Sequence, residues 1–563
     1  MNKKNVVLFL LTSLVFLSSP LLGEELPPKA AIASAHPLAT QAGLDIFEKG
    51  GNAFDAAIAV TATLAVVEPY SSGLGGGGFY LLYQADEENS IMLDAREKAP
   101  SGAFEELYQD HAGNIRPGAS VNGPLAAGIP GIPAALVHLA EHYGKLPLRK
   151  SLATAIHWAK KGFPADKRYI RMAGFRSKIL QNSPAASQIF LDHGRPPAVG
   201  SLIKQPDLAN TLTLLSQKGI NGFYHGELAR KLVKGVQDAG GIWTLDDLAD
   251  YQVVERQPIR GKFNNWTLTT AAPPSSGGIV LQEMLNILSG YDLSSLERPQ
   301  QINLIVEAMR RAYRDRSLYL GDPDFVDIPV EKLLSPLYAA GLRASIRPGK
   351  ATPSTLLAPD KTLEGAGEDT THFSIIDRQG NRVAATLSIN FPFGSGFVPP
   401  GTGILLNDEM DDFSSKPGAP NLYGLIGGAA NAIEPGKRPL SSMTPTFLER
   451  GDKVVIMGTP GGSRIISMVL LAILELDKGH NVEQIVTHPR FHHQYLPDVI
   501  QHEPDAFSAN EAQQLVDMGY TLKNLKRRYG NMQAILWDRR YRLISAASDP
   551  RGIGTTGYFP VGE

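Results

Sequence analysis

The feature that most constrains the fold is an abrupt change of character at the peptide between Asp369 and Thr370. Residues 363–369 hold two glycines and three acids without apolar periodicity, which predicts an exposed loop. Residues 372–377 and 383–389 are instead rich in β-branched and apolar side chains, and a Gln-Gly-Asn turn signal separates them. The sequence therefore predicts a polar loop that runs directly into a two-stranded β-hairpin.

Two interpretations of this junction are open. The simpler one is a surface loop that leads into an ordinary hairpin. The chemical one is cleavage of the peptide before Thr370, which would leave a hydroxyl and a free α-amine on one residue. Such an amine has a pKa of about 7.7–8.0 and suits a general base, so an N-terminal threonine would carry its own nucleophile and its own base.

The first 23 residues have the pattern of a secretory signal peptide. Two lysines precede an apolar run over residues 6–16, and a stretch with a proline and a glycine follows before the first acids. The apolar run is short for a membrane span, although an uncleaved anchor is the alternative. We therefore expect an exported bacterial protein, periplasmic or secreted, that is soluble once residues 1–23 are removed.

The composition of the chain excludes some classes of partner and some kinds of catalytic chemistry. A formal net charge of −2, with 20% charged residues, argues against a nucleic-acid binder. The 563 residues include no cysteine, which excludes disulfides, a thiol nucleophile and thiolate metal sites. Export without cysteine fits a bacterial envelope or secreted enzyme whose stability comes from a packed core.

Helical and strand patterns alternate along the chain and predict a mixed α/β fold. Asn52 is placed to cap an alanine-rich helix over residues 53–60. The glycine-rich residues 72–78 enter a strand over residues 79–83 and lack a Gly-Lys-Ser/Thr ending, so we expect close backbone packing there and no nucleotide site. A second strand covers residues 91–94. Helical spacing recurs over residues 133–143, 148–161, 205–218, 227–239 and 299–319.

Four further motifs accompany the junction, at residues 94–97, 407–414, 438–443 and 458–464. Together with the Thr-Thr-His-Phe-Ser stretch from Thr370, they resemble the motifs of the γ-glutamyltranspeptidases, also called γ-glutamyltransferases or glutathione hydrolases. The order of the motifs agrees, and the resemblance covers nearly the whole chain after the leader. It implies a four-layer αββα sandwich of the N-terminal-nucleophile hydrolase type, with two central β-sheets flanked by helices.

The resemblance also implies that the chain is a precursor that cleaves itself between Asp369 and Thr370. The products would be a large subunit, residues 24–369, and a small subunit, residues 370–563, interleaved in one core as a heterodimer. Asp369 departs from the residues expected at this place in the family.

The catalytic residues follow from the same resemblance. Thr370 is the expected nucleophile, and Gly461 and Gly462 are expected to form the oxyanion hole, because glycines let backbone amides approach a reacting carbonyl closely. Arg96 is expected to hold the α-carboxylate of the γ-glutamyl group through its guanidinium fork. The alternative for a lone arginine after a strand is a solvated charge or a structural ion pair.

Further substrate contacts are expected from an acidic cluster and a serine pair. Glu409 and Asp412 would accept the α-ammonium group of the substrate in charge-assisted hydrogen bonds. A divalent-metal site is the alternative, but the spacing does not match a calcium loop. Ser441 and Ser442 supply neutral donors for the α-carboxylate.

Three more residues complete the expected site. Ser388 and Asn390 end the second hairpin strand, and the Ser388 hydroxyl is expected to hydrogen-bond Thr370. Tyr423 lies in a Gly/Pro-rich stretch, residues 417–428, that resembles the lid loop of some family members. A plain surface loop is the alternative.

Two groups of cationic or titratable residues are expected to be structural. Arginines of the helix over residues 299–319 should face solvent or neighbouring acids: Arg310, Arg311, Arg314 and Arg316. The histidines near residue 490 are expected to have no metal role: His488, His492 and His493.

The expected reaction is γ-glutamyl transfer and hydrolysis, without a cofactor or a metal. Thr370 would take the γ-glutamyl group from glutathione or a related compound and pass it to water or to an amino-acid or peptide amine. The alternatives are a glutaryl-cephalosporin acylase of the same fold and an exported binding protein without catalysis.

Overall fold

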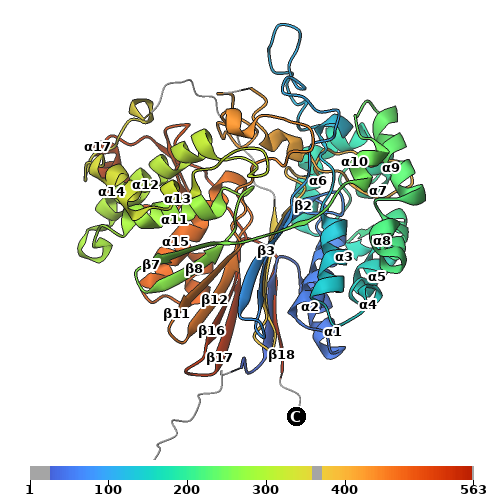
Figure 1. Ribbon diagram of the computed structural model, residues 1–563, viewed down its shortest axis with the longest axis horizontal. Helices are drawn as coiled ribbons and strands as arrows, with labels where there is room; N and C mark the ends of the chain where they lie inside the picture. Colours follow the sequence, from blue (N-terminus) through green and yellow to red (C-terminus); the bar gives the residue numbers. More distant parts are fainter. Residues whose placement is uncertain (1–25, 358–369, 417, 561–563) are drawn as a thin grey trace, which may run out of the picture.

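A pair of β-sheets lies at the centre of the molecule, with helices on the outer face of each sheet (Figure 1). The computed structural model describes residues 26–357, 370–416 and 418–560. Its four layers confirm the predicted αββα sandwich. The predicted signal peptide lies outside the described residues, and within those residues no helix has both the length and the apolar character needed to cross a membrane.

The first sheet has seven strands and the second has six, and all neighbouring strands in them run antiparallel. In spatial order the first sheet contains β18 (Thr555–Phe559), β1 (Ala30–Ser34), β9 (Thr371–Ile376), β10 (Arg382–Ser388), β2 (Gly77–Gln84), β3 (Asn89–Ala95) and β6 (Val254–Arg256). The second contains β17 (Leu543–Ser548), β16 (Gln533–Asp538), β12 (Lys453–Gly458), β11 (Thr446–Arg450), β8 (Trp266–Thr270) and β7 (Ile259–Phe263).

Two helical layers cover these sheets (Figure 1). The layer outside the first sheet contains α1 (Pro37–Glu48), α2 (Ala53–Val67), α3 (Ile132–His142), α4 (Leu148–Ser151), α5 (Ala153–Lys161), α6 (Lys167–Gln181), α7 (Pro184–Phe190), α8 (Pro206–Lys218), α9 (Gly226–Asp238) and α10 (Leu245–Ala249). The layer outside the second contains α11 (Gly277–Leu288), α12 (Arg298–Tyr319), α13 (Val330–Leu333), α14 (Pro336–Ala344), α15 (Ile465–Asp477), α16 (Val482–Thr487) and α17 (Ala509–Asp517). Two small sheets pair β4 (Phe163–Pro164) with β5 (Leu202–Ile203), and β13 (Phe491–His492), β14 (Ile500–His502) and β15 (Leu522–Asn524) with one another.

Each of the two sheets contains strands from both sides of residue 369. In the first sheet β9 and β10 lie between β1 and β2, and β18 forms the edge beside β1. In the second sheet β8 pairs with β11. Because neither residues 26–357 nor residues 370–560 supply a complete sheet, the two parts of the chain share one core.

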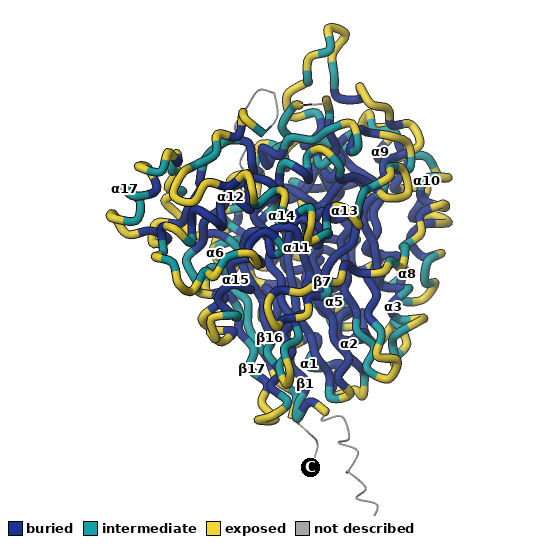
Figure 2. Tube along the Cα trace, turned by 60° about the vertical axis from the view of Figure 1, so that its left-hand side comes forward, coloured by how far each residue is buried: buried dark blue, intermediate teal, exposed yellow. Residues whose placement is uncertain are grey.

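The predicted hairpin is confirmed, although each strand begins one residue earlier than the sequence pattern indicated. β9 and β10 pair with Phe373 opposite Ala385 and Thr371 opposite Leu387. Every residue of the two strands is buried, as are the neighbouring strands in the middle of the molecule (Figure 2). Burial on both faces explains why their apolar residues follow one another without a strict alternation.

The N-terminus of α2 confirms the predicted helix cap. The Asn52 Oδ1 atom accepts hydrogen bonds from the backbone N–H groups of Phe54 and Asp55, both at 3.0 Å, and the Asp55 carboxylate accepts one from the Asn52 N–H. The helix runs seven residues past the predicted end at residue 60, because the apolar sequence continues without a breaker. All of α2 is buried, and its C-terminus places Glu68 beside the start of β9.

The glycine run before β2 is packed directly against other backbone segments. A Cβ atom on Gly75 would lie 2.1 Å from the Leu405 carbonyl oxygen, and one on Gly76 would lie 2.1 Å from that of Ser388. No side chain fits at such distances. The prediction of close backbone packing is therefore confirmed.

His372 of β9 lies where the two sheets meet. Its Nδ1 atom is 2.8 Å from Thr386 Oγ1 and its Nε2 atom is 3.3 Å from Ser374 Oγ. Burial lowers the pKa of His372 to about 3, so the ring is neutral at neutral pH. A Cβ atom on Gly458 would lie 2.3 Å from this ring, so β12 reaches β9 only because residue 458 is glycine.

We predict that Gly458→Ala destabilises the protein by about 1–3 kcal/mol, because the added methyl group overpacks the sheet interface against His372. The free energy of unfolding in urea measures the effect. Gly341→Ala is the matched control: Gly341 lies in α14, and a Cβ atom there would contact nothing within 4 Å. Equal stability of the two variants would contradict the packing argument.

Candidate active site

Thr370 lies immediately before β9 and is only 4% exposed. The next residue fixes its position, because the Thr371 hydroxyl donates a 2.9 Å hydrogen bond to the Glu68 carboxylate at the end of α2. Burial raises the pKa of Glu68 above its usual value. The threonine therefore begins a central strand that a buried side-chain contact holds in place.

Thr370 opens onto a pocket that contains all but one of the predicted site residues. The residues that line this pocket are Arg96, Thr370, Ser388, Asn390, Glu409, Asp412, Tyr423, Leu425, Ser441, Ser442, Met443, Gly462, Ser463 and Ile465. Gly461 is the exception. Gly461 and Gly462 both have positive φ, 141° and 55°, which favours glycine at each position. The structure therefore brings Gly462 to the pocket wall, and Gly461 precedes it in the same turn.

Arg96 is completely buried and joins three separate segments. Its Nη1 atom lies 2.7 Å from a Glu409 carboxylate oxygen, and its Nη2 atom donates a hydrogen bond to Asp412. Its Nε–H donates to the Pro439 carbonyl oxygen at 3.1 Å. Arg96 thus forms a buried ion-pair network with Glu409 and Asp412, the two carboxylates that are expected to bind the α-ammonium group. A structural ion pair was the alternative interpretation of this arginine.

Three carboxyl groups surround the single guanidinium of Arg96. A third carboxylate, that of Glu97, lies 3.5 Å from the guanidinium. Burial raises the pKa of Glu97 to about 8 and raises that of Glu409 well above its usual value, although Arg96 opposes both shifts. At neutral pH these two carboxyl groups are therefore largely protonated, and a cationic group bound beside them would favour their ionised forms.

Asp411, between the two pocket acids, has a different role. Its carboxylate accepts a 2.6 Å hydrogen bond from the Ser120 hydroxyl and a 2.8 Å bond from the backbone N–H of Leu422. Burial raises the pKa of Asp411 to about 6. Asp411 thus anchors the predicted lid loop next to Tyr423, a role that the sequence did not reveal.

Tyr423 covers the pocket. Its hydroxyl donates a 2.8 Å hydrogen bond to the Asn390 carbonyl oxygen, and a Cβ atom on Gly462 would lie 2.4 Å from its ring. The ring is therefore stacked on the backbone of Gly462. The free volume of the pocket is about 20 Å³, which is room for about one water molecule. In this conformation the pocket is therefore too small for a ligand of more than a few atoms.

The other residues of the hairpin end also lie at the pocket. The Ser388 Oγ atom accepts a 2.7 Å hydrogen bond from the Asn390 N–H, and the Asn390 side chain donates to the Asp408 carbonyl oxygen at 2.9 Å. Ser388 and Thr370 line the same pocket, and the hydrogen bond between their hydroxyls stays a prediction.

The serine pair lines the same pocket and has a cation next to it. The Ser441 Oγ atom accepts from the Met443 N–H at 3.1 Å, and the Ser442 Oγ atom accepts from Arg316 Nη2 at 3.3 Å. Since each hydroxyl accepts in these contacts, its own proton can be donated to a ligand.

Arg316 was not expected at the site. Its Nε–H donates to the Ser276 hydroxyl at 2.9 Å, and it forms no ion pair with any carboxylate among the described residues. Burial lowers the pKa of Arg316 to about 10. Three of the four α12 arginines form the predicted pairs with acids: Arg310 and Arg311 with Glu307, and Arg314 with Asp315. A buried cation without such a pair favours an anion beside Ser442.

The predicted structural histidines have protein partners. His492 lies 2.8 Å from Ser467 Oγ and 2.9 Å from Gln494 Oε1, and His493 lies 3.1 Å from Asp498. Burial lowers the pKa of His492 to about 3 and that of His493 to about 4.

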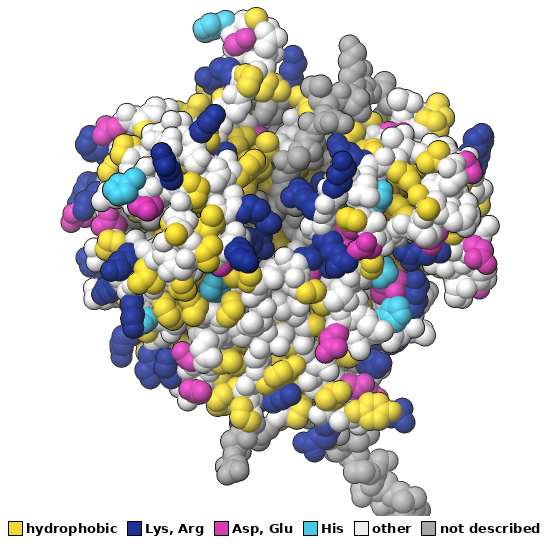
Figure 3. Space-filling view, turned by 180° about the vertical axis from the view of Figure 1, so that it is seen from behind, with side chains coloured by type: hydrophobic (Ala, Val, Ile, Leu, Met, Phe, Trp, Pro, Cys, Tyr) yellow, Lys and Arg dark blue, Asp and Glu magenta, His cyan; other side chains and the backbone are white. Residues whose placement is uncertain are grey.

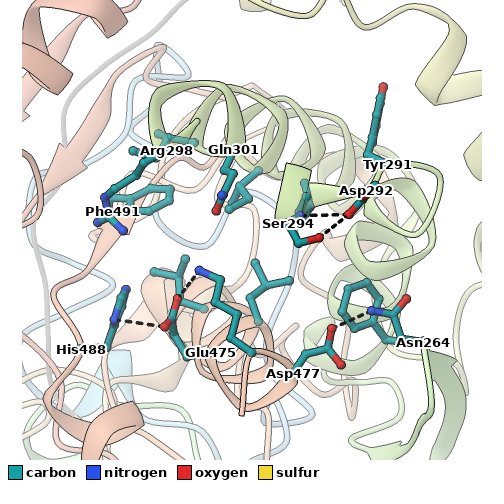
Figure 4. A pocket seen from close by; sticks show the side chains of 17 residues that line it. Asn264, Tyr291, Asp292, Ser294, Arg298, Gln301, Glu475, Asp477, His488 and Phe491 are labelled. Carbon is teal, nitrogen blue, oxygen red and sulfur yellow. Dashed lines mark hydrogen bonds and ion pairs between the residues drawn. The ribbon is translucent and has the colours of Figure 1, made fainter. Parts of the chain in front are cut away.

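A separate cavity of about 290 Å³ lies at the other end of α15 (Figure 4). Glu475 points into it and contacts Lys478 at 2.8 Å and His488 at 3.8 Å, while Asn264 bonds Asp477 at 2.7 Å. No predicted catalytic or substrate-binding residue lines this cavity. Of these two cavities, only the Thr370 pocket is lined by predicted catalytic or substrate-binding residues.

The sandwich, with a threonine at the head of a central strand facing a glycine turn, defines the N-terminal-nucleophile hydrolase class. A family model described as Gamma-glutamyltranspeptidase matches residues 39–559. The chain belongs to the γ-glutamyltranspeptidase family, and it is an enzyme.

Known relatives agree with this assignment. A glutathione hydrolase proenzyme of Pseudomonas sp. (strain A14) is 44% identical over 493 residues, which cover 87% of this chain and 85% of that protein. One of Escherichia coli (strain K12) is 40% identical over 534 residues, which cover 94% and 91%. Among solved structures, a cephalosporin acylase from Bacillus halodurans matches with a TM-score of 0.83 and 29% identity, over 98% of this chain and 99% of that chain.

We predict that Arg96→Met lowers the free energy of unfolding by about 3–5 kcal/mol, because it leaves buried carboxylates without their cation. Adding Glu409→Gln should recover part of this loss, since one uncompensated charge is then removed. Urea unfolding of the single and double variants measures both effects. If Glu409→Gln gave no recovery in the Arg96→Met background, the ion-pair network would not be the source of the stability.

Proposed function

We propose that this enzyme cleaves the γ-glutamyl amide bond of glutathione and related compounds through a γ-glutamyl-Thr370 intermediate. The observation that carries the proposal is one pocket that holds a threonine hydroxyl, a guanidinium and two carboxylates. A γ-glutamyl group needs these partners, because it has a reacting carbonyl at one end and an α-ammonium and an α-carboxylate at the other.

The contacts of a bound γ-glutamyl group follow from the charges. The α-carboxylate is placed against Arg96 and the donor hydroxyls of Ser441 and Ser442. The α-ammonium group is placed against Glu409 and Asp412. A zwitterion adds one cation and one anion, so it can enter the Arg96 network without changing its net charge, and its ammonium group would favour the ionised form of Glu409.

In the proposed reaction the Thr370 oxygen attacks the γ-carbonyl and its proton passes to the Thr370 α-amine. The backbone amides of Gly461 and Gly462 stabilise the oxyanion, and both residues have the positive φ that this turn requires. Collapse of the intermediate breaks the amide bond, and the departing amine takes the proton. Water or the amine of an amino acid or peptide then attacks the ester and releases Thr370.

This mechanism requires a free α-amine, so we propose that the chain matures by cleavage between Asp369 and Thr370 into subunits 24–369 and 370–563. Asp369 lies outside the described residues. Support comes from the name proenzyme that the relatives carry, and from the interleaved strands, which would keep both products in one core. The pattern of residues 1–23 further supports export to the periplasm or the medium.

We predict that Thr370→Ala abolishes both maturation and turnover, because one hydroxyl serves as nucleophile in both, whereas Thr370→Ser keeps part of each. Intact mass spectrometry and γ-glutamyl anilide hydrolysis measure the two processes. Full-length chain in an active wild-type preparation would contradict self-cleavage, and a Thr370→Ala variant of normal activity would contradict the nucleophile.

A glutaryl acylase is the second candidate, because a cephalosporin acylase shares 29% identity and the fold with this chain. The two substrates differ only where glutamyl carries an ammonium group and glutaryl carries hydrogen. Carboxylates built to pair a cation stay unpaired when the cation is missing, and such sites can reject the analogue by about 10⁴-fold.

We therefore predict a strong preference for γ-glutamyl over glutaryl anilide in kcat/KM. Asp412→Ala should lower activity on the glutamyl compound much more than on the glutaryl one, while Ser442→Ala, which removes a carboxylate donor, should affect both. Similar kcat/KM values of the wild-type enzyme for both anilides would favour the acylase.

A further inference from the structure

Helix α6 is the most basic helix beside the pocket. Its 15 residues include five basic side chains and no acidic one: Lys167, Arg168, Arg171, Arg176 and Lys178. The formal charge of the whole chain is only −2, so this helix departs sharply from the average. Seen from behind, Lys and Arg side chains gather around the middle of the face of the molecule (Figure 3).

The buried side of α6 is fixed to the loop that follows β10. Arg176 Nη2 donates to the Gly394 carbonyl oxygen at 2.7 Å, and its guanidinium lies 5.2 Å from the Phe391 ring centre. Tyr169 packs edge-on against Phe393 at 5.7 Å. This loop begins at Asn390, which lines the pocket. The middle of α6 is therefore one residue removed from the pocket wall.

The N-terminal turn of α6 is tied to the nucleophile's strand by a second route. The Arg168 guanidinium lies 5.4 Å from the Tyr70 ring centre. The Tyr70 hydroxyl donates to Glu68 at 3.3 Å, and Glu68 in turn accepts from Thr371. Two independent chains of contacts thus place α6 beside the pocket, at Asn390 and at the residue after Thr370.

The outer side of α6 presents a single row of exposed residues, which we call the α6 ridge: Lys167, Arg171, Phe175 and Lys178. Their spacing of four, four and three residues puts them on one helical face. None of the three cations forms an ion pair with another described residue. Phe175 is 65% exposed, and its ring meets that of Phe391 edge-on at 5.6 Å.

We propose that the α6 ridge binds acidic peptides on the leaving-group side of the site. This inference rests on the proposed function, and it concerns the part of a donor beyond its γ-glutamyl group and the acceptor peptide that later takes its place. The bound class is a peptide with carboxylate side chains, whose charges pair with Lys167, Arg171 and Lys178 while its backbone or side chains pack on Phe175.

The length of the ridge fits such a chain. Residues 167 and 178 are 11 positions apart, which is about 16 Å along a helix. An extended peptide covers about 3.3 Å per residue, so about five residues would span it. A free amino acid that serves as acceptor would not reach beyond the part of the ridge that contacts Phe391. The ridge therefore discriminates among peptides by charge and length, separately from the recognition of the γ-glutamyl group by Arg96.

The test compares two tetrapeptide acceptors, Gly-Gly-Gly-Gly and Gly-Glu-Glu-Glu, with γ-glutamyl anilide as donor. We expect the wild-type enzyme at low salt to favour the acidic peptide by about fivefold or more in acceptor kcat/KM, and 0.5 M NaCl to remove most of this preference. The variant Lys167→Glu/Arg171→Glu/Lys178→Glu should reverse the preference.

A matched control variant changes the same charge elsewhere. Arg149→Glu/Lys150→Glu/Lys160→Glu alters three exposed cations on α4 and α5, away from α6 (Figure 1), and should keep the wild-type ratio of the two acceptors. An equal ratio for the wild-type enzyme and the α6 variant, or an equal change in both variants, would overturn the proposal. Absence of any γ-glutamyl anilide turnover by the wild-type enzyme would instead contradict the proposed function.

Discussion

The buried guanidinium of Arg96 is the interaction on which the site depends. It connects the end of β3 with the acidic turn at Glu409 and Asp412 and with the Pro439 carbonyl oxygen, which are far apart in the sequence. A charge that is fully removed from water is stable only with such partners. The same contacts that hold three segments together therefore also gather several carboxyl groups at one end of the pocket.

Thr370, the proposed nucleophile, is positioned by sheet packing together with the hydrogen bond from Thr371 to Glu68. β9 brings Thr370 to the pocket because it is enclosed between β1 and β10, and because His372 fits against Gly458 of the second sheet. The turn that contains Gly462 follows β12. The distance between the Thr370 hydroxyl and the Gly462 amide therefore depends on the separation of the two sheets. Reactive groups on rigid strands are held more precisely than groups on loops.

Local sequence signals predicted much of this structure. The Asn52 cap, the hairpin after Thr370 and the helical spacings are short-range patterns, and the structure confirms them. The pocket set was predicted through the family resemblance and not from spacing, since its members are brought together by tertiary packing. The pairing of Arg96 with its own predicted neighbours was missed because a sequence pattern contains no distances.

Other features could not be predicted from the sequence, again because a sequence pattern contains no distances. Arg316 has the same helical pattern as the arginines that pair with acids, and only the fold places it behind Ser442. Asp412 illustrates what such convergence implies for function. It bonds Arg96 and also accepts a 3.1 Å hydrogen bond from Asn421, two residues before Tyr423. Under the proposed function, an ammonium group at Asp412 would share this carboxylate with Asn421, which would couple occupation of the pocket to the position of Tyr423.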